Sequence, residues 1–578
     1  SPFAGSSPSS RRWAEGCEGS TGIDGIAAMA VSGNKVRVFA GTYEYFNGRM
    51  FAALQALGIA TTLLATADAS SYSEALWAHR LTSNGESYVV DAVYTRYTNV
   101  YTIGNYYDNL LQNGVTVTTG PMLIQKTSTT GSYIAWSYTG GSTTQTDLGT
   151  SIAGDTGDFV YATGASSGSS TTFGATTLAN KGLSDAIIFK ISSLEGNVIW
   201  AHNFGSSSND IATDVAVTSD DASVYVVGSS ETIGTITFGI DSSATQLTYD
   251  GTGPESGSAS TAFIAKMSAS GTVEWARNPT HYYSSARAKS VATDYAGDAY
   301  VAGYADYHEE FAFLAFGTHT IQYSTTNQVF IAKISAAGTW QWAYAAPGTW
   351  EAGDMVSASQ IYHILAVDTS SPSADQLYAV GYSKPTTSTH KTTVTKLTLA
   401  GAASGTFTTT LPGGSGDSVH LNKAYAIECD AEGSLIVAGQ AVGPSEFAAV
   451  AIGSTTTTQA TSFIAKILST GSVQWANSYA SGTVNSAEGS SAIMAIADFP
   501  GGLFVGGYHK GPLTVGSTVL DDTTGVSKGY YSLIATTAPP PPPPSLPPPP
   551  PPSLPPPPPP SLPPPPPPSL PPPPPPSL

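Results

Sequence analysis

The 578-residue sequence predicts an all-β protein built from repeated units of short strands, followed by a proline-rich tail. Three observations support this prediction. A strand-like run that closes on glycine recurs eight times, a strand that ends in tryptophan recurs seven times, and the last 40 residues repeat PPPPPPSL five times. No stretch keeps the 3.6-residue period of an amphipathic helix. The chain therefore divides into a head, residues 1–538, and a tail, residues 539–578.

The first recurring element is a run of β-branched and aromatic residues, such as FVYATG, SVYVVG and DAYVAG. Period-2 patterning of this kind is typical of a β-strand. The runs stand 58 to 78 residues apart, and they close on Gly41, Gly104, Gly164, Gly228, Gly303, Gly381, Gly439 and Gly507.

The second recurring element is an apolar strand that ends in tryptophan. Because the position recurs in seven of eight units, we assign it to the core between neighbouring units, in preference to the sugar-stacking platforms that exposed indoles would offer. Phe407 takes the remaining position. The predicted core residues are Trp13, Trp77, Trp136, Trp200, Trp275, Trp342 and Trp475.

The third element, read most clearly as FIAK, brings a recurring lysine. Each lysine could line a ligand-binding face, but a residue repeated in six units usually serves the unit itself. We therefore expect each to extend over its own unit and to pair with a turn aspartate such as Asp294, Asp430 or Asp498. The lysines are Lys126, Lys190, Lys266, Lys333, Lys396 and Lys466.

A fourth element, an Ile/Val/Ala-rich run entering a turn, completes a unit of about 60–70 residues with at least four short strands. Four strands in each of eight units predict a single β-propeller with eight four-stranded blades. Seven blades are the alternative if the divergent first repeat is structurally absent. The last unit lacks a Trp strand, so we expect the N-terminal strand at Trp13 to close it and to remove an exposed edge.

The segments TAFIAKMSASGTVEWA (261–276) and TDYAGDAYVAGY (293–304) resemble bacterial-type β-propeller repeats. In that family a unit reads roughly as Ala-Val-Asp-x-x-Gly-Asn-x-Tyr-Val-x-Gly, followed by Asp-Ala-Phe-x-Ala-Lys and Gly-x-x-x-Trp. The resemblance covers essentially the whole head, although the first two repeats depart from it strongly. It implies the propeller fold and no particular activity, because this fold hosts many.

The tail predicts a polyproline II rod, because proline fixes φ and lacks the N–H that a helix or sheet needs. Two interpretations are open: a ligand for aromatic-grooved or profilin-like domains, or a rod that resembles those of hydroxyproline-rich glycoproteins of plant and green-algal walls. The second implies hydroxylation and O-linked sugars. The implied positions are Pro539, Pro540, Pro541, Pro542, Pro543, Pro544, Ser545, Pro547, Pro548, Pro549, Pro550, Pro551, Pro552, Ser553, Ser561, Ser569 and Ser577.

Composition excludes several classes of function. Charged residues make up 11% of the chain and the formal net charge is −19, so the electrostatic footprint of a nucleic-acid-binding protein is missing. The longest apolar run, residues 51–65, is too short and interrupted to span a bilayer. Two cysteines are too few for a disulfide scaffold, and the only disulfide within one chain would join Cys17 and Cys429.

No catalytic motif, metal site or cofactor site is predicted. The Asp-rich turns at residues 154–158 and 219–223 lack the ordered oxygen spacing of known calcium loops. The DYHEE cluster at residues 306–310 reads as a solvated loop. The scattered histidines belong to no HExxH-type motif, and no P-loop occurs.

Together these features predict a secreted structural glycoprotein of the cell surface or cell wall, with its signal peptide already removed. We expect it to assemble with copies of itself into a fibril that resembles mastigoneme or wall glycofibril components of algae. The rods would carry O-linked glycans of the arabinose/galactose type. The alternatives are a stalked propeller lectin or adhesin, and a polysaccharide-active enzyme.

Overall fold

The computed structural model describes residues 26–32, 35–40 and, with short internal gaps, 75–534, and every regular element among them is a β-strand. In this part of the chain there is no helix that could cross a membrane. The chain divides into two compact units, residues 1–71 and 72–578. The described residues of the first unit form an antiparallel hairpin of β1 (Ile26–Ser32) and β2 (Lys35–Ala40).

The described residues of the second unit form seven antiparallel meanders of four strands. The first meander consists of β5 (Ser87–Thr95), β6 (Asn99–Tyr106), β9 (Met122–Ser128) and β10 (Ile134–Gly140), and the second of β11 (Leu148–Gly154), β12 (Phe159–Ser166), β15 (Asp185–Ser192) and β16 (Val198–Gly205). The third consists of β17 (Asp210–Val217), β18 (Ser223–Ser230), β21 (Thr261–Ser268) and β22 (Val273–Arg277), and the fourth of β24 (Ser284–Thr293), β25 (Ala299–Tyr307), β28 (Gln328–Ile334) and β29 (Trp340–Thr349). The fifth meander consists of β30 (Leu365–Val367), β31 (Leu377–Thr386), β32 (Thr389–Leu397) and β33 (Ala403–Phe407), and the sixth of β34 (Lys423–Cys429), β35 (Leu435–Val442), β38 (Ala460–Ile467) and β39 (Val473–Tyr479). The seventh consists of β40 (Ser490–Phe499), β41 (Gly502–Lys510), β44 (Lys528–Ile534) and β3 (Ala75–Arg80).

Six meanders carry a short hairpin between their second and third strands. These hairpins are β7 (Leu110–Gln112) with β8 (Val115–Val117), β13 (Ser170–Phe173) with β14 (Thr176–Ala179), β19 (Thr235–Phe238) with β20 (Thr245–Thr248), β26 (Phe313–Phe316) with β27 (His319–Gln322), β36 (Ser445–Phe447) with β37 (Val450–Ile452), and β42 (Leu513–Val515) with β43 (Thr518–Leu520). Two further short strands, β4 (Thr82–Ser83) and β23 (Thr280–Tyr282), extend the β7–β8 and β26–β27 hairpins.

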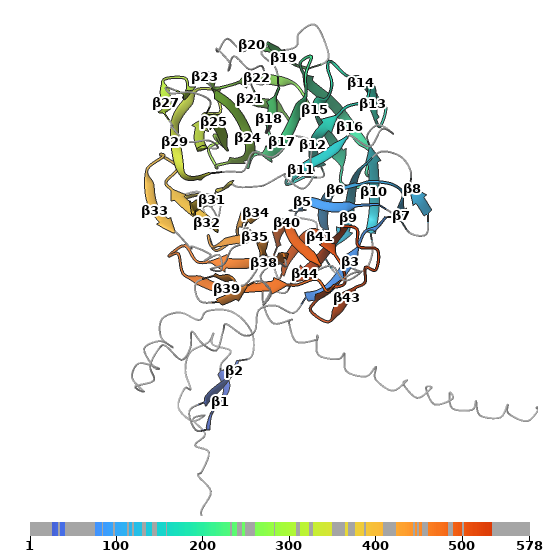
Figure 1. The fold of residues 1–578 in the computed structure, drawn as a ribbon, viewed down its shortest axis with the longest axis vertical. Helices are drawn as coiled ribbons and strands as arrows, with labels where there is room; N and C mark the ends of the chain where they lie inside the picture. The colour runs from blue at the N-terminus through green and yellow to red at the C-terminus, as the bar shows by residue number, and fades with distance from the viewer. Residues whose placement is uncertain are drawn as a thin grey trace, which may run out of the picture. The chain divides into compact units, whose positions relative to one another are not determined.

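The meanders of the second unit are arranged around a common centre (Figure 1). Strands such as β5, β11 and β34 lie near that centre, and fourth strands such as β33 and β39 lie at the periphery (Figure 1). Radial repetition of four-stranded meanders is the arrangement of a β-propeller, as the sequence predicted. The apolar core lies between neighbouring meanders: Tyr225 and Trp275 of the third meander pack in one cluster with Ala288 and Val301 of the fourth.

The glycine of the second strand recurs because the neighbouring backbone leaves no room for a side chain there. In six meanders the first strand is irregular beside this glycine, as between Ala288 and Ser290 opposite Gly303. A Cβ added to the glycine would lie 1.9–2.4 Å from a first-strand carbonyl oxygen, so only glycine allows the backbones to approach this closely. The six residues are Gly104, Gly164, Gly228, Gly303, Gly439 and Gly507.

The fourth strand of the last meander comes from the start of the second unit. β3 pairs antiparallel with β44, from Ala75 opposite Ile534 to Arg80 opposite Tyr530. The register shifts just before Trp77, as it does before Trp136 in β10, so β3 behaves as a regular fourth strand.

This pairing corrects one detail of the sequence prediction. The strand of Trp13 was expected beside the last unit, but Trp13 lies outside the described residues and the strand of Trp77 occupies that edge. Because the Trp77 strand is the fourth strand of the last meander, it does not also complete a separate first unit. The described ranges contain seven four-stranded meanders, the number given by the alternative prediction.

The glycine at the irregular pairing should not tolerate a side chain. Gly303→Ala would bring a Cβ to 2.0 Å from the Arg287 carbonyl oxygen, and we expect the free energy of unfolding to fall by about 2–3 kcal/mol. Gly482→Ala is the matched control, because its nearest neighbour would be an ordinary contact at 3.5 Å. Urea denaturation of both variants checks the prediction, and equal loss of stability in the two would refute it.

Candidate functional site

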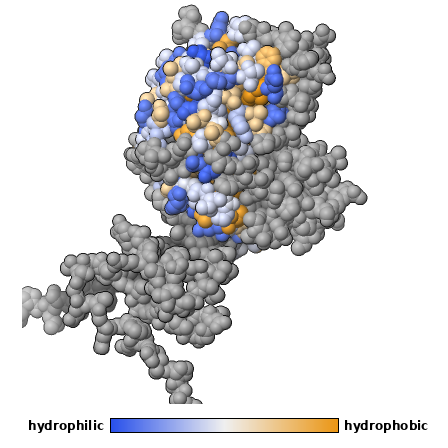
Figure 2. All heavy atoms as spheres, turned by 90° about the vertical axis from the view of Figure 1, so that its left-hand side faces the viewer, coloured by the Kyte–Doolittle hydropathy of each residue, from blue (hydrophilic) through white to orange (hydrophobic). Residues whose placement is uncertain are grey.

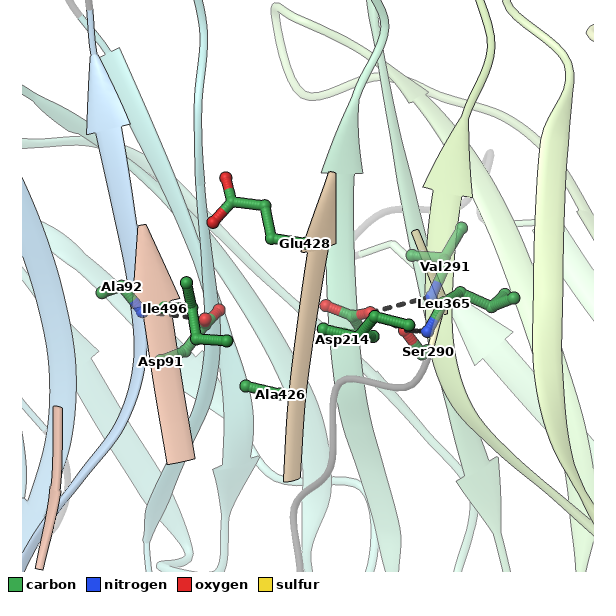
Figure 3. Close-up of a pocket in the computed structure, with 10 residues that line it drawn as sticks. Asp91, Ala92, Asp214, Ser290, Val291, Leu365, Ala426, Glu428 and Ile496 are labelled. Carbon is green, nitrogen blue, oxygen red and sulfur yellow. Dashed lines mark hydrogen bonds between the residues drawn. The ribbon is translucent and has the colours of Figure 1, made fainter. Parts of the chain in front are cut away.

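A cavity of about 160 Å³ lies where first strands of different meanders meet. Three carboxylate side chains line it: Asp91 from β5, Asp214 from β17 and Glu428 from β34 (Figure 3). The rest of the lining is small or apolar and includes neither Lys nor Arg. The remaining lining residues are Ala92, Ser290, Val291, Leu365, Ala426, Ile427 and Ile496.

Asp91 and Asp214 perform the same structural task in alternate meanders. Asp91 Oδ2 accepts hydrogen bonds from the Ile152 amide at 2.8 Å and from the Ser151 hydroxyl at 2.9 Å, both on the next first strand. Asp214 Oδ2 accepts from the Val291 amide and the Ser290 hydroxyl, both at 2.8 Å (Figure 3). Each carboxylate therefore ties its own first strand to that of the following meander.

Ser151 connects the two carboxylates. Its Oγ lies 2.9 Å from Asp91 Oδ2 and 2.7 Å from Asp214 Oδ1, and all three side chains are buried. Hydrogen bonds to a buried carboxylate are among the stronger ones in proteins, because the charge is poorly solvated. The polar contacts thus continue from β5 through β11 and β17 to β24 across four meanders.

On another part of the lining, Glu428 makes a similar tie to β40, the first strand of the following meander. Glu428 Oε2 accepts a hydrogen bond from the Asp498 amide at 3.0 Å. Burial raises the pKa of Glu428 well above its ordinary value, and the nearby carboxylates of Asp498, Asp91 and Asp430 add to the effect. Burial likewise raises the pKa of Asp498 to about 7, helped by Asp430 and Glu432 and opposed by Lys466.

This arrangement suits a small donor-rich or cationic group, because the cavity offers carboxylate oxygens and no positive charge. Its volume is below the roughly 300 Å³ at which ordinary ligand pockets begin, so it can take one small group and not a whole oligosaccharide. Among the described residues no three His, Cys, Asp or Glu side chains come close enough together to hold a metal ion.

The recurring Trp and Lys form a second repeated structure, which we call the interunit clasp. The Trp136 indole N–H and the Lys126 ammonium both donate to the Ser193 carbonyl of the next meander, at 2.9 and 2.8 Å. Trp200 and Lys190 share the Ala269 carbonyl in the same way. Three further clasps are Trp275 and Lys266 on the Ala336 carbonyl, Trp342 on the Leu399 carbonyl and Lys396 on the Ser469 carbonyl.

Local sequence explains the clasp. The Tyr of the glycine-closing run, the Lys and the Trp are direct cross-strand partners, as in Tyr161, Lys190 and Trp200, so they share one face of the sheet. The acceptor lies in the turn between third and fourth strands. In four clasps the indole covers a turn glycine with φ of 74–94°, where an added Cβ would come within 3.0 Å of the ring. These glycines are Gly196, Gly271, Gly338 and Gly401.

Several recurring lysines also contact acidic residues. Lys333 lies 3.1 Å from Asp294, Lys466 lies 2.6 Å from Asp430, and Lys190 lies 4.0 Å from Asp155. These three pairs each lie within one meander, and Lys266 pairs instead with Glu274, which lies on strand β22 and not in a turn.

The other residues singled out in the sequence fall in different places. Trp275 and Trp475 are buried, whereas Trp136, Trp200 and Trp342 are partly buried. Trp13, Cys17 and every tail position lie outside the described residues, and of Trp77 only the backbone is described. Cys429 ends β34 and takes part in no disulfide within the described ranges.

The two Asp-rich turns considered for calcium meet each other. The Thr156 amide donates to Asp221 Oδ1 at 3.0 Å, and Asp155 accepts from the amides of Gly157 and Phe159. These contacts use the carboxylates to fold and join the turns of adjacent meanders.

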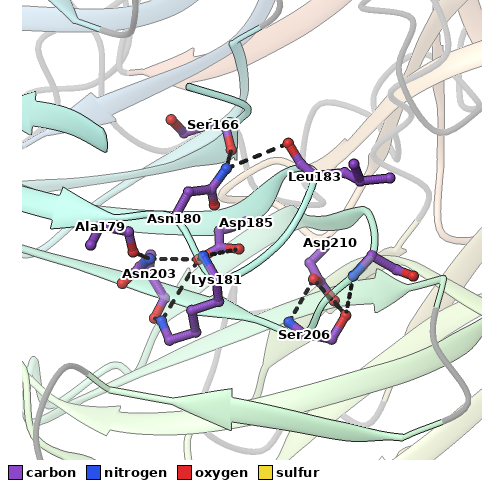
Figure 4. Close-up of polar contacts among 10 residues, drawn as sticks. Ser166, Ala179, Asn180, Lys181, Leu183, Asp185, Asn203, Ser206 and Asp210 are labelled. Atoms are coloured by element: carbon purple, nitrogen blue, oxygen red, sulfur yellow. Dashed lines mark hydrogen bonds and ion pairs between the residues drawn. The ribbon is translucent and has the colours of Figure 1, made fainter. Parts of the chain in front are cut away.

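Buried aspartates also anchor a loop within the second meander and the connection from the second meander to the third (Figure 4). Asp185 accepts from the Lys181 amide and the Asn203 side chain, and Asp210 accepts from the Ser206 amide at 2.7 Å. Burial raises the pKa of Asp210 to about 6. The contacts lie within the loops, so this cluster serves the fold.

Sequence reasoning missed Asp91, Asp214 and Glu428. A signal was present, because each acidic residue interrupts a run of small and apolar residues within its strand, in VVDAV, ATDVAV and AIEC. The residues do not recur at one position in every unit, so a search for repeats passes over them.

No family model matches the sequence, and no curated protein matches it. The β-propeller domain of the Trilobed protease from Pyrococcus furiosus is a similar solved structure, with a TM-score of 0.35 and 9% identity over 77% of this chain and 98% of that chain. The Dos1 propeller gives a TM-score of 0.34 and 11% identity over 78% and 94%. Chaetomium thermophilum Raptor gives 0.37 and 9% over 86% of this chain, but only 33% of Raptor. All three scores lie below 0.5, so nothing about function is taken from these proteins.

Removing the Asp214 carboxylate should loosen the centre of the head. Asp214→Ala leaves the donors on Val215, Ser290 and Val291 without their acceptor, and we expect a loss of about 2–4 kcal/mol in the free energy of unfolding. Ser151 keeps Asp91 as its acceptor in this variant. Ser290→Ala removes one hydroxyl, which donates to Asp214 and accepts from the Leu365 amide at 3.3 Å, and should cost about 1 kcal/mol. Denaturant titration compares the two, and an Asp214→Ala loss no larger than that of Ser290→Ala would contradict the role given to Asp214.

The stability of the head should fall as Asp498 ionises. Its pKa is raised from 3.8 to about 7, so the folded state binds more protons than the unfolded state between these values and loses stability as pH rises through them. Asp498→Asn should therefore gain about 1–2 kcal/mol relative to the parent protein between pH 5 and pH 8, allowing for partial exposure of the carboxylate. The matched control Asp220→Asn changes an exposed carboxylate whose pKa is lowered, so its difference from the parent should stay constant over this range. A constant difference for Asp498→Asn would be the contrary result.

Proposed function

We propose that the protein is an extracellular structural glycoprotein whose head carries a stiff, O-glycosylated polyproline rod and assembles into a surface fibril or cell-wall-type filament. The pairing of Ala75 with Ile534 is the observation that supports this most. It brings the end of the head beside its closing strand, and the tail follows five residues later at Pro539. The rod thus follows β44, a strand that is paired on both edges, with β41 on one and β3 on the other.

We further propose that the head is a seven-bladed propeller closed by β3. The seven meanders and the repeated clasp support this reading. A closed ring leaves only the short outer edges of its fourth strands free for pairing between heads, so assembly would depend mainly on the rod. The low charge of the chain, 11% charged residues, fits a surface whose solubility comes partly from glycans.

Assembly follows from one head and one rod per chain. A contact between the rod of one copy and the head of another is heterologous, so it propagates into a filament instead of closing. Forty residues of polyproline II reach about 120 Å, enough to pass along a neighbouring head. The partners are therefore other copies of the chain, with O-linked glycans that stiffen the rod.

A second candidate function is favoured by the acidic cavity. Asp91, Asp214 and Glu428 could accept hydrogen bonds from one sugar residue or bind one cationic group, as a stalked lectin or adhesin would. This function needs no assembly and predicts ligand binding by a monomer.

Removing the tail should abolish filaments and leave the head intact. We expect a chain that ends at Ala538 to keep the melting temperature of the full chain and to sediment as a monomer, while the full glycosylated chain forms filaments visible by electron microscopy. A chain whose tail is replaced by forty Gly and Ser residues is the matched control, because it keeps length and loses stiffness. Filaments of normal appearance from the shortened chain would refute the fibril proposal.

Mass spectrometry of tail peptides from native material tests the chemistry separately. Hydroxylated prolines with attached pentoses are the expected result. Unmodified prolines would favour the other interpretation of the tail, a ligand for aromatic-grooved domains.

A further inference from the structure

The fourth meander carries two basic residues at positions where five other meanders do not have such a pair. At the irregular pairing of its first strand, Lys289 is the extra residue of β24, and Arg287 lies opposite Tyr304 of β25. In the other five meanders with this irregularity the extra residue is uncharged: Val90, Thr150, Thr213, Tyr425 or Met494. A feature that occurs once in a repeated structure is not required by the repeat, so we examined its surroundings.

Both basic side chains lie against the same aromatic ring. Arg287 Cζ is 5.8 Å and Lys289 Nζ is 5.9 Å from the centre of the Tyr304 ring. Tyr304 also packs in one apolar cluster with Leu365 and Leu377 of the fifth meander. The two cations and the phenol therefore gather where the fourth meander meets the fifth.

The positive charge of this cluster is only partly neutralised. In the described ranges its single ion pair joins Arg287 Nη1 to Asp306 Oδ2 at 3.0 Å. Lys289 is 8% exposed, and its ammonium has neither an ion pair nor a hydrogen bond with a residue of those ranges. Burial lowers the pKa of Lys289 to about 8, and the neighbouring Arg287 adds to the effect. Charged groups are seldom buried without a partner, because the charge loses its hydration.

The cluster also contains hydrogen-bonding atoms that are buried and unused. Arg287 Nε and the Tyr304 hydroxyl have no hydrogen-bond partner, and Tyr304 is 1% exposed. Buried polar atoms normally have one. With the ammonium of Lys289 they make three donors that lack an acceptor. A negatively charged group with several acceptor oxygens is the complement of such a set.

We propose that Arg287, Lys289 and Tyr304 form a binding site for one small oxyanion, a sulfate or phosphate group. Two cations against the single carboxylate of Asp306 leave one positive charge for this anion. The side chains of Arg287 and Asp306 are 17% and 18% exposed, so the cluster is in contact with solvent. Guanidinium and ammonium groups both bind such oxygens through charge-assisted hydrogen bonds. The inference does not depend on the proposed fibril function.

Calorimetric titration of the full chain with inorganic phosphate and inorganic sulfate, at constant ionic strength, tests the site. We expect one anion to bind per chain, and Lys289→Met and Tyr304→Phe each to weaken binding on the order of tenfold, as the loss of one hydrogen bond implies. Lys423→Met is the matched control and should leave binding unchanged. Lys423 occupies in β34 the position that Arg287 occupies in β24.

Melting temperatures give a second readout. Without an oxyanion, Lys289→Met should melt no lower than the parent protein, because it loses an unpaired buried charge. Added phosphate should raise the melting temperature of the parent and of Lys423→Met, but not that of Lys289→Met. A sulfated disaccharide distinguishes the source of the group: tighter binding than inorganic sulfate assigns it to a glycan, and weaker binding assigns it to a free ion.

Two results would overturn the proposal. One is the absence of phosphate and sulfate binding by the folded parent chain. The other is binding that persists unchanged in both Lys289→Met and Tyr304→Phe, since the anion would then lie elsewhere. Neither result concerns filaments, so failure of the anion site is distinguishable from failure of the fibril proposal.

Discussion

The contact between neighbouring meanders is the constraint on which the rest of this structure depends. A four-stranded sheet cannot bury both of its faces alone, so each meander relies on the next one for its core. The clasp adds directional hydrogen bonds to that apolar contact, because an indole N–H and an ammonium both donate to one carbonyl in a turn of the neighbouring meander. The clasp residues therefore link the strand register to the spacing of the meanders, and they indicate the meander at which the repeated pattern ends.

The centre of the head is fastened by a different chemistry. There the first strands are joined by carboxylates that accept from serine hydroxyls and backbone amides of the following strand. Burying such groups without a lysine or arginine is costly, and the raised pKa values of Glu428 and Asp498 are the sign of that cost. The acidic cavity is thus both a part of the scaffold and the best candidate for a small ligand site.

The repeated features could be predicted from the sequence, and the single features could not. The glycine-closing strand and the order of four strands per unit could be predicted because the fold requires them in every meander. The close approach of the Arg287 carbonyl to Gly303 is one example. The choice of Trp77 over Trp13 as the neighbour of β44 depends on long-range pairing with Leu533, which no local pattern encodes. Asp91, Asp214 and Glu428 were missed because each occurs once or in alternate units, and only the ring arrangement brings them together.

The central claim is that the strand of Trp77 pairs with β44 as the fourth strand of the last meander, and cysteine cross-linking tests it most directly. In a chain without Cys17 and Cys429, Ala78→Cys is paired with Ser532→Cys, since the two residues face each other across the strands. Ala14→Cys with Ser532→Cys is the matched control, because Ala14 follows Trp13 as Ala78 follows Trp77. The account predicts rapid disulfide formation for the first pair in the folded protein and none for the second. Cross-linking of Ala14→Cys in place of Ala78→Cys would contradict it.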